Sequence, residues 1–198
     1  SVGTPMNSVK IRIEEKDENG IGEIVAKGPN VMQGYYNQPE ETAKAIVDGW
    51  FYTGDLGRID SKGNLIITGR KKNVIVLKNG KNVFPEEIEE MIMKLPYVSE
   101  CMMFTREKHN ELVLWCEIVY EPALLEDESI TREQLAARFA KDLADINDIL
   151  PKYKHINHFI MSEEPMIKTT TQKVKRRAEV DKIYKQWDDE KCYNTIMK

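Results

Sequence analysis

A carboxylate next to a glycine is the first candidate for chemistry in this chain. Asp55 follows Thr53 and Gly54 at the corner between two predicted strands. A carboxylate in that place can accept hydrogen bonds from two neighbouring hydroxyl groups, as on a ribose. Turns also favour Asp for their own geometry, so the same residues fit a polar turn that binds nothing.

Two short polar segments could contact an extended ligand. Arg70 directly follows a predicted strand, and its planar guanidinium could reach the same sugar or a phosphate. Gly80 lies between Asn79 and Lys81 in a predicted turn, where the backbone could approach a ligand. The alternatives are a solvated charged linker at residues 69–72 and an ordinary hairpin at residues 79–81.

The most basic segment of the chain, residues 168–177, places Lys173 on a threonine-rich loop. A lysine ammonium there could neutralise negative charge that develops between a carboxylate and a phosphate. A nucleic-acid site would need interleaved aromatic side chains or a wider basic surplus, and the segment has neither. The alternative is a solvated basic segment in front of a helix.

The composition fits a globular protein and excludes several classes. The 198 residues are 41% hydrophobic and 31% charged, and the net charge of -4 argues against a general nucleic-acid binder. Neither a membrane-spanning run of about 18 apolar residues nor the apolar core of a signal peptide is present in the sequence. The sequence therefore predicts a cytoplasmic location, and it leaves peripheral association with a membrane open.

The cysteines and histidines show no pattern of a metal site. The three cysteines lack C-x-x-C spacing, which favours a reducing compartment. His155 and His158 fall in one predicted strand, where a separation of three would point them to opposite faces. Together with His109 they form neither a metal-ligand nor a catalytic-triad pattern, so we predict no metal ligands in this chain. The cysteines are Cys101, Cys116 and Cys192.

The elements that must position these residues differ between the two parts of the chain. The first part alternates with period two and has a turn at Asn19–Gly20, which predicts a hairpin and further strands. Pro39 and the acidic residues after it predict a short helix. The strands are expected at residues 9–13, 22–26, 50–52, 56–60 and 64–68, and the helix at residues 39–47.

From about residue 71 the patterns of strand and helix alternate. Thr131 and Gln134 form a capping box for a long helix that ends at Leu150–Pro151. Asn79–Gly80 indicates a two-residue hairpin turn. Strands are expected at residues 74–77, 98–104, 111–120 and 155–161, and further helices at residues 85–95 and 178–187.

The order and spacing of seven motifs resemble the adenylate-forming superfamily, which includes acyl-CoA synthetases. The sequences of residues 70–73 and 79–82 are most similar to those of bacterial long-chain fatty acyl-CoA ligases. The resemblance covers nearly the whole chain. The motifs are Gly22–Ile24, Val31–Asn37, Gly49–Asp55, Gly63–Leu65, Gly69–Ile75, Asn82–Glu89 and Pro165–Arg177.

The resemblance implies an α+β fold with two parts and a two-step reaction. Residues 1–69 would be the last β-rich subdomain of the large adenylation domain, and residues 70–198 the mobile C-terminal lid. A carboxylic acid, such as a fatty acid, would react with ATP to give acyl-AMP. CoA would then displace AMP.

Specific residues take on roles through the resemblance. Asp55 and Arg70 would hold the ribose, and Lys173 would be the catalytic lysine of adenylation. Lys72 would be the hinge about which the lid turns between the half-reactions. Gly80 would approach the pantetheine arm of CoA. The sequence departs from the family at Gln172, where the motif usually has glycine before the lysine.

Two motifs of the superfamily do not occur in the sequence. The 198 residues contain neither a phosphate loop rich in Gly, Ser and Thr nor the motif that holds adenine and Mg²⁺. Both are expected upstream of Ser1, in the N-terminal domain of the same enzyme. We therefore expect the chain to be the C-terminal portion of a ligase and to be inactive without that domain.

Three alternatives remain open on the sequence alone. The acyl group could be transferred to a carrier protein instead of CoA. The chain could be a regulatory module that docks on a separate ATP-binding subunit. It could also be an α+β domain that retains the motifs by descent without catalysis.

Overall fold

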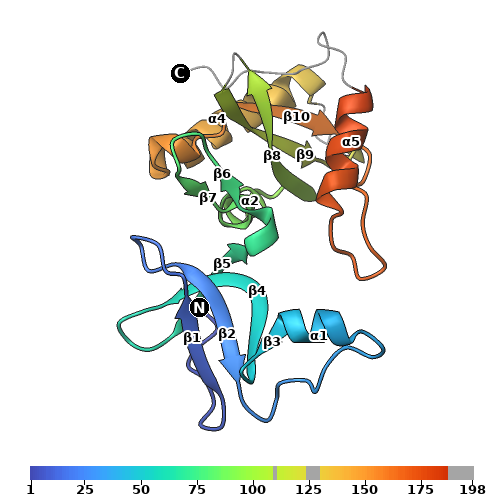
Figure 1. The fold of residues 1–198 in the computed structure, drawn as a ribbon. Coiled ribbons are helices and arrows are strands. Elements are labelled where there is room, and N and C mark those ends of the chain that lie inside the picture. Colours follow the sequence, from blue (N-terminus) through green and yellow to red (C-terminus); the bar gives the residue numbers. More distant parts are fainter. Residues whose placement is uncertain (109–110, 124–129, 187–198) are drawn as a thin grey trace. The chain divides into compact units, whose positions relative to one another are not determined.

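The chain forms two compact units, Ser1–Val74 and Ile75–Lys198. The computed structural model describes residues 1–108, 111–123 and 130–186 (Figure 1). Each unit has its own sheet and its own hydrophobic cluster. The α+β class predicted from the sequence is confirmed.

The first unit is built on one five-stranded sheet. The strand order is β1-β2-β4-β3, and β5 pairs with β4 on the same edge as β3. The predicted hairpin at its start is confirmed, because β1 and β2 are antiparallel neighbours. The elements are β1 (Lys10–Glu14), β2 (Gly22–Lys27), α1 (Pro39–Ala45), β3 (Ile46–Val47), β4 (Trp50–Ile59), β5 (Leu65–Arg70) and the 3₁₀ turn η1 (Lys71–Asn73).

Two predictions for this unit are wrong in detail. The segments expected as two strands around Thr53–Gly54 form the single strand β4. The predicted corner is a bulge within it, since Glu23 pairs with Leu56 while Val25 pairs with Tyr52. The predicted helix at 39–47 ends at Ala45, because Ile46 and Val47 pair with β4 as a strand.

The second unit has a three-stranded sheet with β9 in the centre. β8 pairs antiparallel with β9, and β10 pairs parallel with it. A separate two-stranded hairpin, β6 with β7, precedes the first helix. The elements are β6 (Ile75–Val76), β7 (Asn82–Val83), α2 (Pro85–Ile92), β8 (Glu100–Lys108), β9 (Glu111–Val119), α4 (Arg132–Ile149), the 3₁₀ turn η2 (Lys152–Lys154), β10 (His158–Ser162) and α5 (Arg176–Gln186).

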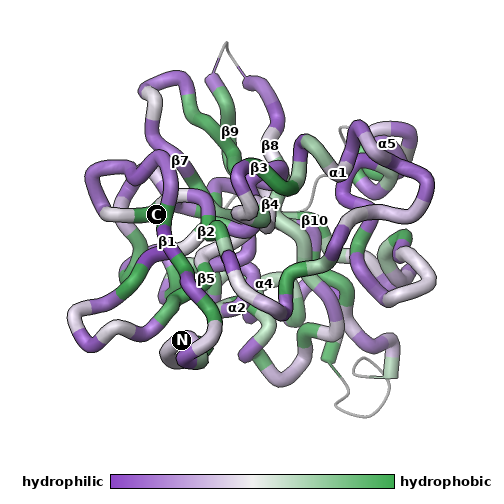
Figure 2. Tube along the Cα trace, turned by 60° about the horizontal axis from the view of Figure 1, so that its bottom comes forward, coloured by the Kyte–Doolittle hydropathy of each residue, from purple (hydrophilic) through white to green (hydrophobic). Residues whose placement is uncertain are grey.

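Alternate side chains of β9 point to opposite faces of the sheet, where they pack in two different hydrophobic clusters, so this unit has three layers. Leu114, Cys116 and Ile118 belong to the large cluster that includes the buried faces of α2 and α4. Trp115 and Val119 belong to a second cluster with side chains of α5. Figure 2 shows the corresponding hydrophobic stretches along β8 and β9. The helices α2 and α4 therefore cover one face of the sheet, and α5 covers the other (Figure 1).

The predictions for the long helix α4 are confirmed. Thr131 accepts a hydrogen bond from the Gln134 amide, and the Gln134 side chain returns to the Thr131 amide. Leu150 is the C-cap, directly before Pro151. The predicted apolar stripe is buried and consists of Leu135, Phe139, Leu143 and Ile146.

Other element boundaries in this unit differ from the predictions. The last strand begins at His158 instead of 155, because the amide and carbonyl of Ile156 are hydrogen-bonded to the Asn147 side chain. The hairpin loop holds residues 77–81 instead of two residues, since Leu77 and Lys81 close it by a hydrogen bond. The helix α2 ends at Ile92, and α5 begins at Arg176. His109, Trp187 and Cys192 lie outside the described residues.

None of the helices among the described residues is both long and apolar enough to cross a membrane.

Candidate functional site

The structure brings Asp55 and Arg70 together in the first unit. They are register partners on the neighbouring strands β4 and β5, and Arg70 Nε lies 2.7 Å from Asp55 Oδ1. A hollow of about 310 Å³ lies beside the pair, lined by Gly54, Arg70, Lys71 and Lys72. The Arg70 guanidinium lines the hollow and the Asp55 carboxylate is paired with it, so the two side chains offer donors and an acceptor of the kind that ribose hydroxyl groups need.

The backbone bulge at Thr53–Gly54 borders the hollow through Gly54. Gly54 has a φ of +71°, a conformation that favours glycine, and a Cβ built there would meet nothing within 4 Å. Thr53 Oγ1 donates to the Ile24 carbonyl at 2.7 Å and accepts from the Asp55 amide at 3.0 Å. These bonds fix the backbone on which Asp55 stands.

Glu23 supports the same bulge, and this structural role was not predicted from the sequence. Its side chain is 8% exposed, and Oε1 accepts a hydrogen bond from the Gly54 amide at 3.2 Å. Oε2 lies 2.7 Å from Lys71 Nζ, and this hydrogen bond raises the pKa of Lys71. A charged residue within the otherwise uncharged segment 22–26 was the signal that could have identified it.

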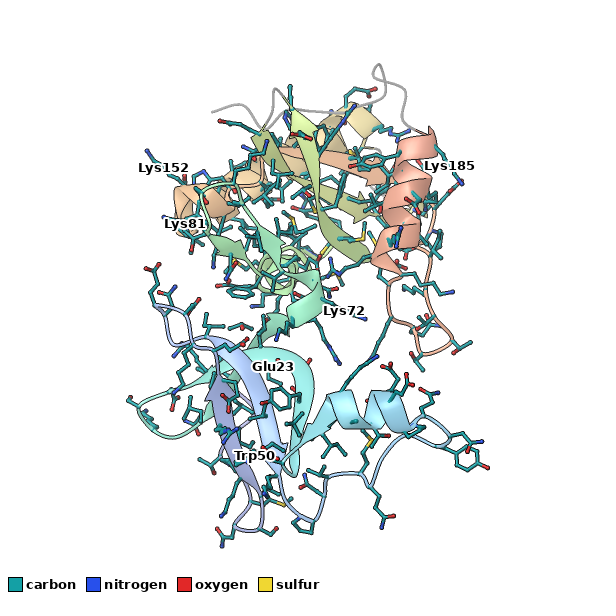
Figure 3. The ribbon with its side chains drawn as sticks, in the orientation of Figure 1. Glu23, Trp50, Lys72, Lys81, Lys152 and Lys185 are labelled. Carbon is teal, nitrogen blue, oxygen red and sulfur yellow. The ribbon has the colours of Figure 1, made fainter. Side chains whose placement is uncertain are left out.

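Lys72 lies in η1, directly after β5, and its side chain is exposed (Figure 3). The chain continues from this turn through Asn73 and Val74 into the second unit. The hinge at Lys72 and the domain boundary between residues 69 and 70 stay predictions.

Gly80 stands at the exposed turn of the β6–β7 hairpin in the second unit. Its φ is +79°, and a Cβ built there would meet nothing within 4 Å, so the backbone is open to a ligand. The next residue, Lys81, holds its ammonium 4.5 Å from the centre of the Tyr153 ring. Figure 3 shows Lys81 and Lys152 on this side of the unit.

Lys173 lies on an exposed hairpin between β10 and α5. The Gln172 amide donates to the Thr169 carbonyl at 3.0 Å, and Gln172 has a φ of +61°. This is the left-handed conformation that glycine adopts readily, so Gln172 takes the shape expected of the usual family glycine. The Lys173 amide donates to Thr169 Oγ1 at 3.2 Å.

An ion pair ties the end of this hairpin to α2. Arg176 donates from Nη1 to Glu89 Oε1 at 2.7 Å and from Nη2 to Glu89 Oε2 at 2.5 Å. Glu89 also accepts from the Met103 amide at 2.6 Å. Burial opposes the charge of Arg176, but the hydrogen bonds that Arg176 donates to Glu89 and the charge of Glu89 raise its pKa.

Gly80 and Lys173 lie at different faces of the second unit. The Gly80 hairpin packs through Val83 into the cluster with α2 and α4. The Lys173 hairpin packs through Met166 into the cluster with α5. Asp55 and Arg70 belong to the first unit.

Beneath α5 lies a buried carboxyl group, Glu117 of β9, whose side chain is almost wholly enclosed. Burial raises the pKa of Glu117 to about 8, and the neighbouring charge of Glu179 adds to the shift. Because the pKa is above the value of 4.5 for an exposed carboxyl, the folded unit binds a proton that the unfolded chain releases. This contribution to stability is complete below pH 4.5 and is lost as the pH rises through about 8.

We expect Glu117→Gln to flatten this pH dependence. The wild-type second unit should lose roughly 2 kcal/mol of unfolding free energy between pH 6 and 8 through Glu117, and the variant should not. Urea unfolding followed by the amide signals of β9 measures the difference. Glu111→Gln, an exposed acid on the same strand, is the control and should behave as wild type. Equal slopes for Glu117→Gln and wild type would contradict the assignment.

No group of three or more His, Cys, Asp or Glu side chains that could hold a metal ion occurs within residues 1–108, 111–123 and 130–186. The residues described above offer hydrogen bonds and cationic charge instead. They suit the sugar and the phosphate of a nucleotide.

A family model described as "AMP-binding enzyme C-terminal domain" matches residues 72–194. A long-chain-fatty-acid–CoA ligase of Escherichia coli O6:H1 is 35% identical over 161 residues, which cover 77% of this chain and 28% of that protein. A 2-succinylbenzoate–CoA ligase of Bacillus cytotoxicus is 41% identical over 104 residues, which cover 50% of this chain and 21% of that protein.

Among solved structures, the chain is similar to an O-succinylbenzoate coenzyme A synthetase of Bacillus subtilis in complex with AMP. The TM-score is 0.70 and the identity 27%, with 88% of this chain and 34% of that chain covered. The chain thus spans about a third or less of the length of these relatives.

Proposed function

The chain belongs to the family of AMP-binding enzyme C-terminal domains, and we propose that it acts as the C-terminal part of an AMP-forming acid–thiol ligase. The predicted resemblance to adenylate-forming enzymes is confirmed by the family match and the relatives. The observation that carries the proposal is the Asp55–Arg70 pair at its open hollow. We call an enzyme that joins this chain to an ATP-phosphate-binding region the complete ligase.

In the first half-reaction, a carboxylate oxygen attacks the α-phosphorus of ATP and the bond to pyrophosphate breaks. Asp55 accepts hydrogen bonds from the ribose hydroxyl groups, and Arg70 contacts the same sugar. Lys173 places its ammonium between the two reacting anions and lowers their repulsion in the transition state. Its exposure on a hairpin tip leaves it free to reach a site outside this chain. The Mg²⁺ site belongs to the region that binds the ATP phosphates.

In the second half-reaction, the sulfur of CoA attacks the acyl carbon and AMP leaves. The open backbone at Gly80 approaches the pantetheine arm. The different faces of Gly80 and Lys173 within the second unit support a rotation that exchanges one for the other. Lys72, in the turn just before the division between the units, is the hinge.

We propose a long-chain fatty acid as the acyl substrate. The fatty-acid–CoA ligase matches the longer segment, 161 residues against 104 for the succinylbenzoate ligase. A comparison of kcat/KM for palmitate, octanoate and 2-succinylbenzoate in the complete ligase tests this choice. We expect palmitate to give the highest value, and a preference for 2-succinylbenzoate would overturn it.

The acceptor of the acyl group needs its own experiment, since the sequence also allowed a carrier protein. AMP release that depends on CoA, with acyl-CoA as product, is the expected result. Acyl-AMP that accumulates with CoA and disappears with an acyl carrier protein would favour the alternative.

The hinge assignment predicts a selective effect of Lys72→Pro. Proline fixes its own φ and disfavours the helical conformation of Lys71 in η1, so rotation about this turn should be restricted. We expect acyl-AMP formation within about threefold of wild type and thioester formation slowed at least tenfold. Single-turnover assays of each half-reaction measure both rates.

Lys72→Ala keeps the torsional freedom and is the matched control. It should keep the wild-type ratio between the rates of the two half-reactions. If Lys72→Pro slows only the adenylation step, Lys72 is not the hinge.

A further inference from the structure

The hairpin that carries Lys173 is positioned by its stem. Residues 163–175 connect β10 to α5 (Figure 1). Near the tip, the Thr169 amide donates to the Lys173 carbonyl at 2.8 Å, and below it the Lys175 amide donates to the Ile167 carbonyl at 2.8 Å. Since Lys173 itself is exposed, its place depends on how the segment 166–168 is held.

Two carboxylates from different elements hold this segment. Glu100 of β8 accepts from the Met166 amide at 3.0 Å and lies 2.7 Å from Lys168 Nζ. Glu179 of α5 accepts from the Ile167 amide at 2.6 Å. Consecutive backbone amides of the stem are thus bonded to the sheet on one side and to the helix on the other.

Glu179 is the more unusual of the two acids because its side chain is fully enclosed. Its Oε1 lies 2.5 Å from Lys182 Nζ on the same helix. Glu117 of β9 faces it from the sheet, and burial raises the pKa of Glu117 to about 8. The Ile167 amide and the Lys182 ammonium thus lie at the two oxygens of the enclosed Glu179 side chain.

Stability alone does not explain an acid at this position. The apolar cluster on this face includes Met166, Ile183 and Trp115. Replacement of a buried ion pair by apolar side chains of similar volume is often neutral or stabilising. Leucine at position 179 together with methionine at position 182 would therefore satisfy the fold, but the leucine could not accept the hydrogen bond from Ile167.

From these contacts we infer that Glu179 is a positioning residue for Lys173: its enclosed carboxylate fixes the stem of the hairpin and so aims the lysine at the adenylation site. The inference rests on the role proposed above for Lys173. Glu100 provides the second attachment of the same stem.

The test compares Glu179→Leu with Glu179→Gln. In the complete ligase, Glu179→Leu should lower kcat of acyl-AMP formation at least tenfold and leave KM for ATP unchanged. Thioester formation from supplied acyl-AMP should proceed at the wild-type rate. Glu179→Gln retains a carbonyl oxygen for the Ile167 amide and should restore adenylation to within threefold of wild type.

Amide hydrogen exchange in the 198-residue chain tests the contact without any activity. Glu179→Leu should speed exchange at Ile167 at least tenfold, and Glu179→Gln should not. The amide of Ile118, near the carboxyl end of β9, is the internal control and should exchange alike in all three proteins.

Each outcome decides a separate point. Wild-type adenylation by Glu179→Leu, or equal losses in the Leu and Gln variants, would overturn the positioning role. If the exchange results hold but Lys173→Ala leaves adenylation unchanged, the role of Lys173 fails while the contact stands. If Glu179→Leu does not fold, the double variant Glu179→Leu/Lys182→Met, which removes both buried charges, is judged by the same criteria.

Discussion

Replacing Lys173 by alanine in the complete ligase should slow acyl-AMP formation by about 10²–10³-fold, the usual cost of removing one group that stabilises transition-state charge. The lysine lies on an exposed hairpin whose stem is bonded to β8 and α5. Thioester formation from supplied acyl-AMP should change less than threefold, because Lys173 has no part in that step. Rapid-quench measurements of the two half-reactions give both rates.

Lys175→Ala is the matched control for this prediction. Lys175 is an exposed lysine two residues along the same hairpin, and its backbone amide bond to Ile167 is kept in the variant. The control should adenylate at the wild-type rate. An equal loss in both half-reactions for Lys173→Ala would point to damage of the fold and would contradict the assigned role.

The second large effect is expected for Glu89→Ala. Glu89 is the bidentate partner of Arg176 and also accepts from the Met103 amide. Its removal leaves a largely enclosed guanidinium without its principal acceptor, which typically costs 3–5 kcal/mol. Urea unfolding of the 198-residue chain, followed by the amide signals of β9, should show a loss of about 3 kcal/mol in the second unit.

Two further variants give this experiment its controls. Glu90→Ala breaks only the exposed pair with Lys94 and should cost less than about 0.5 kcal/mol. Glu89→Leu combined with Arg176→Met removes both charges and should recover most of the stability lost in Glu89→Ala. A loss below about 1 kcal/mol for Glu89→Ala would show that the pair contributes little to the fold.

The sequence predicted correctly those helix boundaries that depend on hydrogen bonds and residues close to them in the chain. The capping box of Thr131 and Gln134 and the stop at Pro151 delimit α4 within its own sequence. The strand β4 could not be predicted as one element, because Thr53–Gly54 has the composition of a turn. Its continuity depends on β2, which pairs with β4 on both sides of the bulge.

In the candidate site, too, the sequence predicted individual residues but not the contacts between residues that are distant in sequence. The motifs identified Asp55 and Arg70 one by one, but their ion pair depends on the register of β4 and β5. The contacts of Glu100 with residues 166 and 168 join positions more than sixty residues apart. Sequence periodicity carries no information on such pairs, so the attachment of the Lys173 hairpin emerges only in the folded unit.

AMP release tests whether the complete ligase forms AMP and whether this chain needs a separate phosphate-binding region to do so. The 198-residue chain and the complete ligase are each incubated with ATP, Mg²⁺, CoA and palmitate. We expect AMP, pyrophosphate and palmitoyl-CoA in equal amounts from the complete ligase, and no AMP above the buffer control from the chain alone. AMP production by the chain alone would place a phosphate site within these residues and contradict the division of roles. ADP as the product of the complete ligase would contradict the reaction itself.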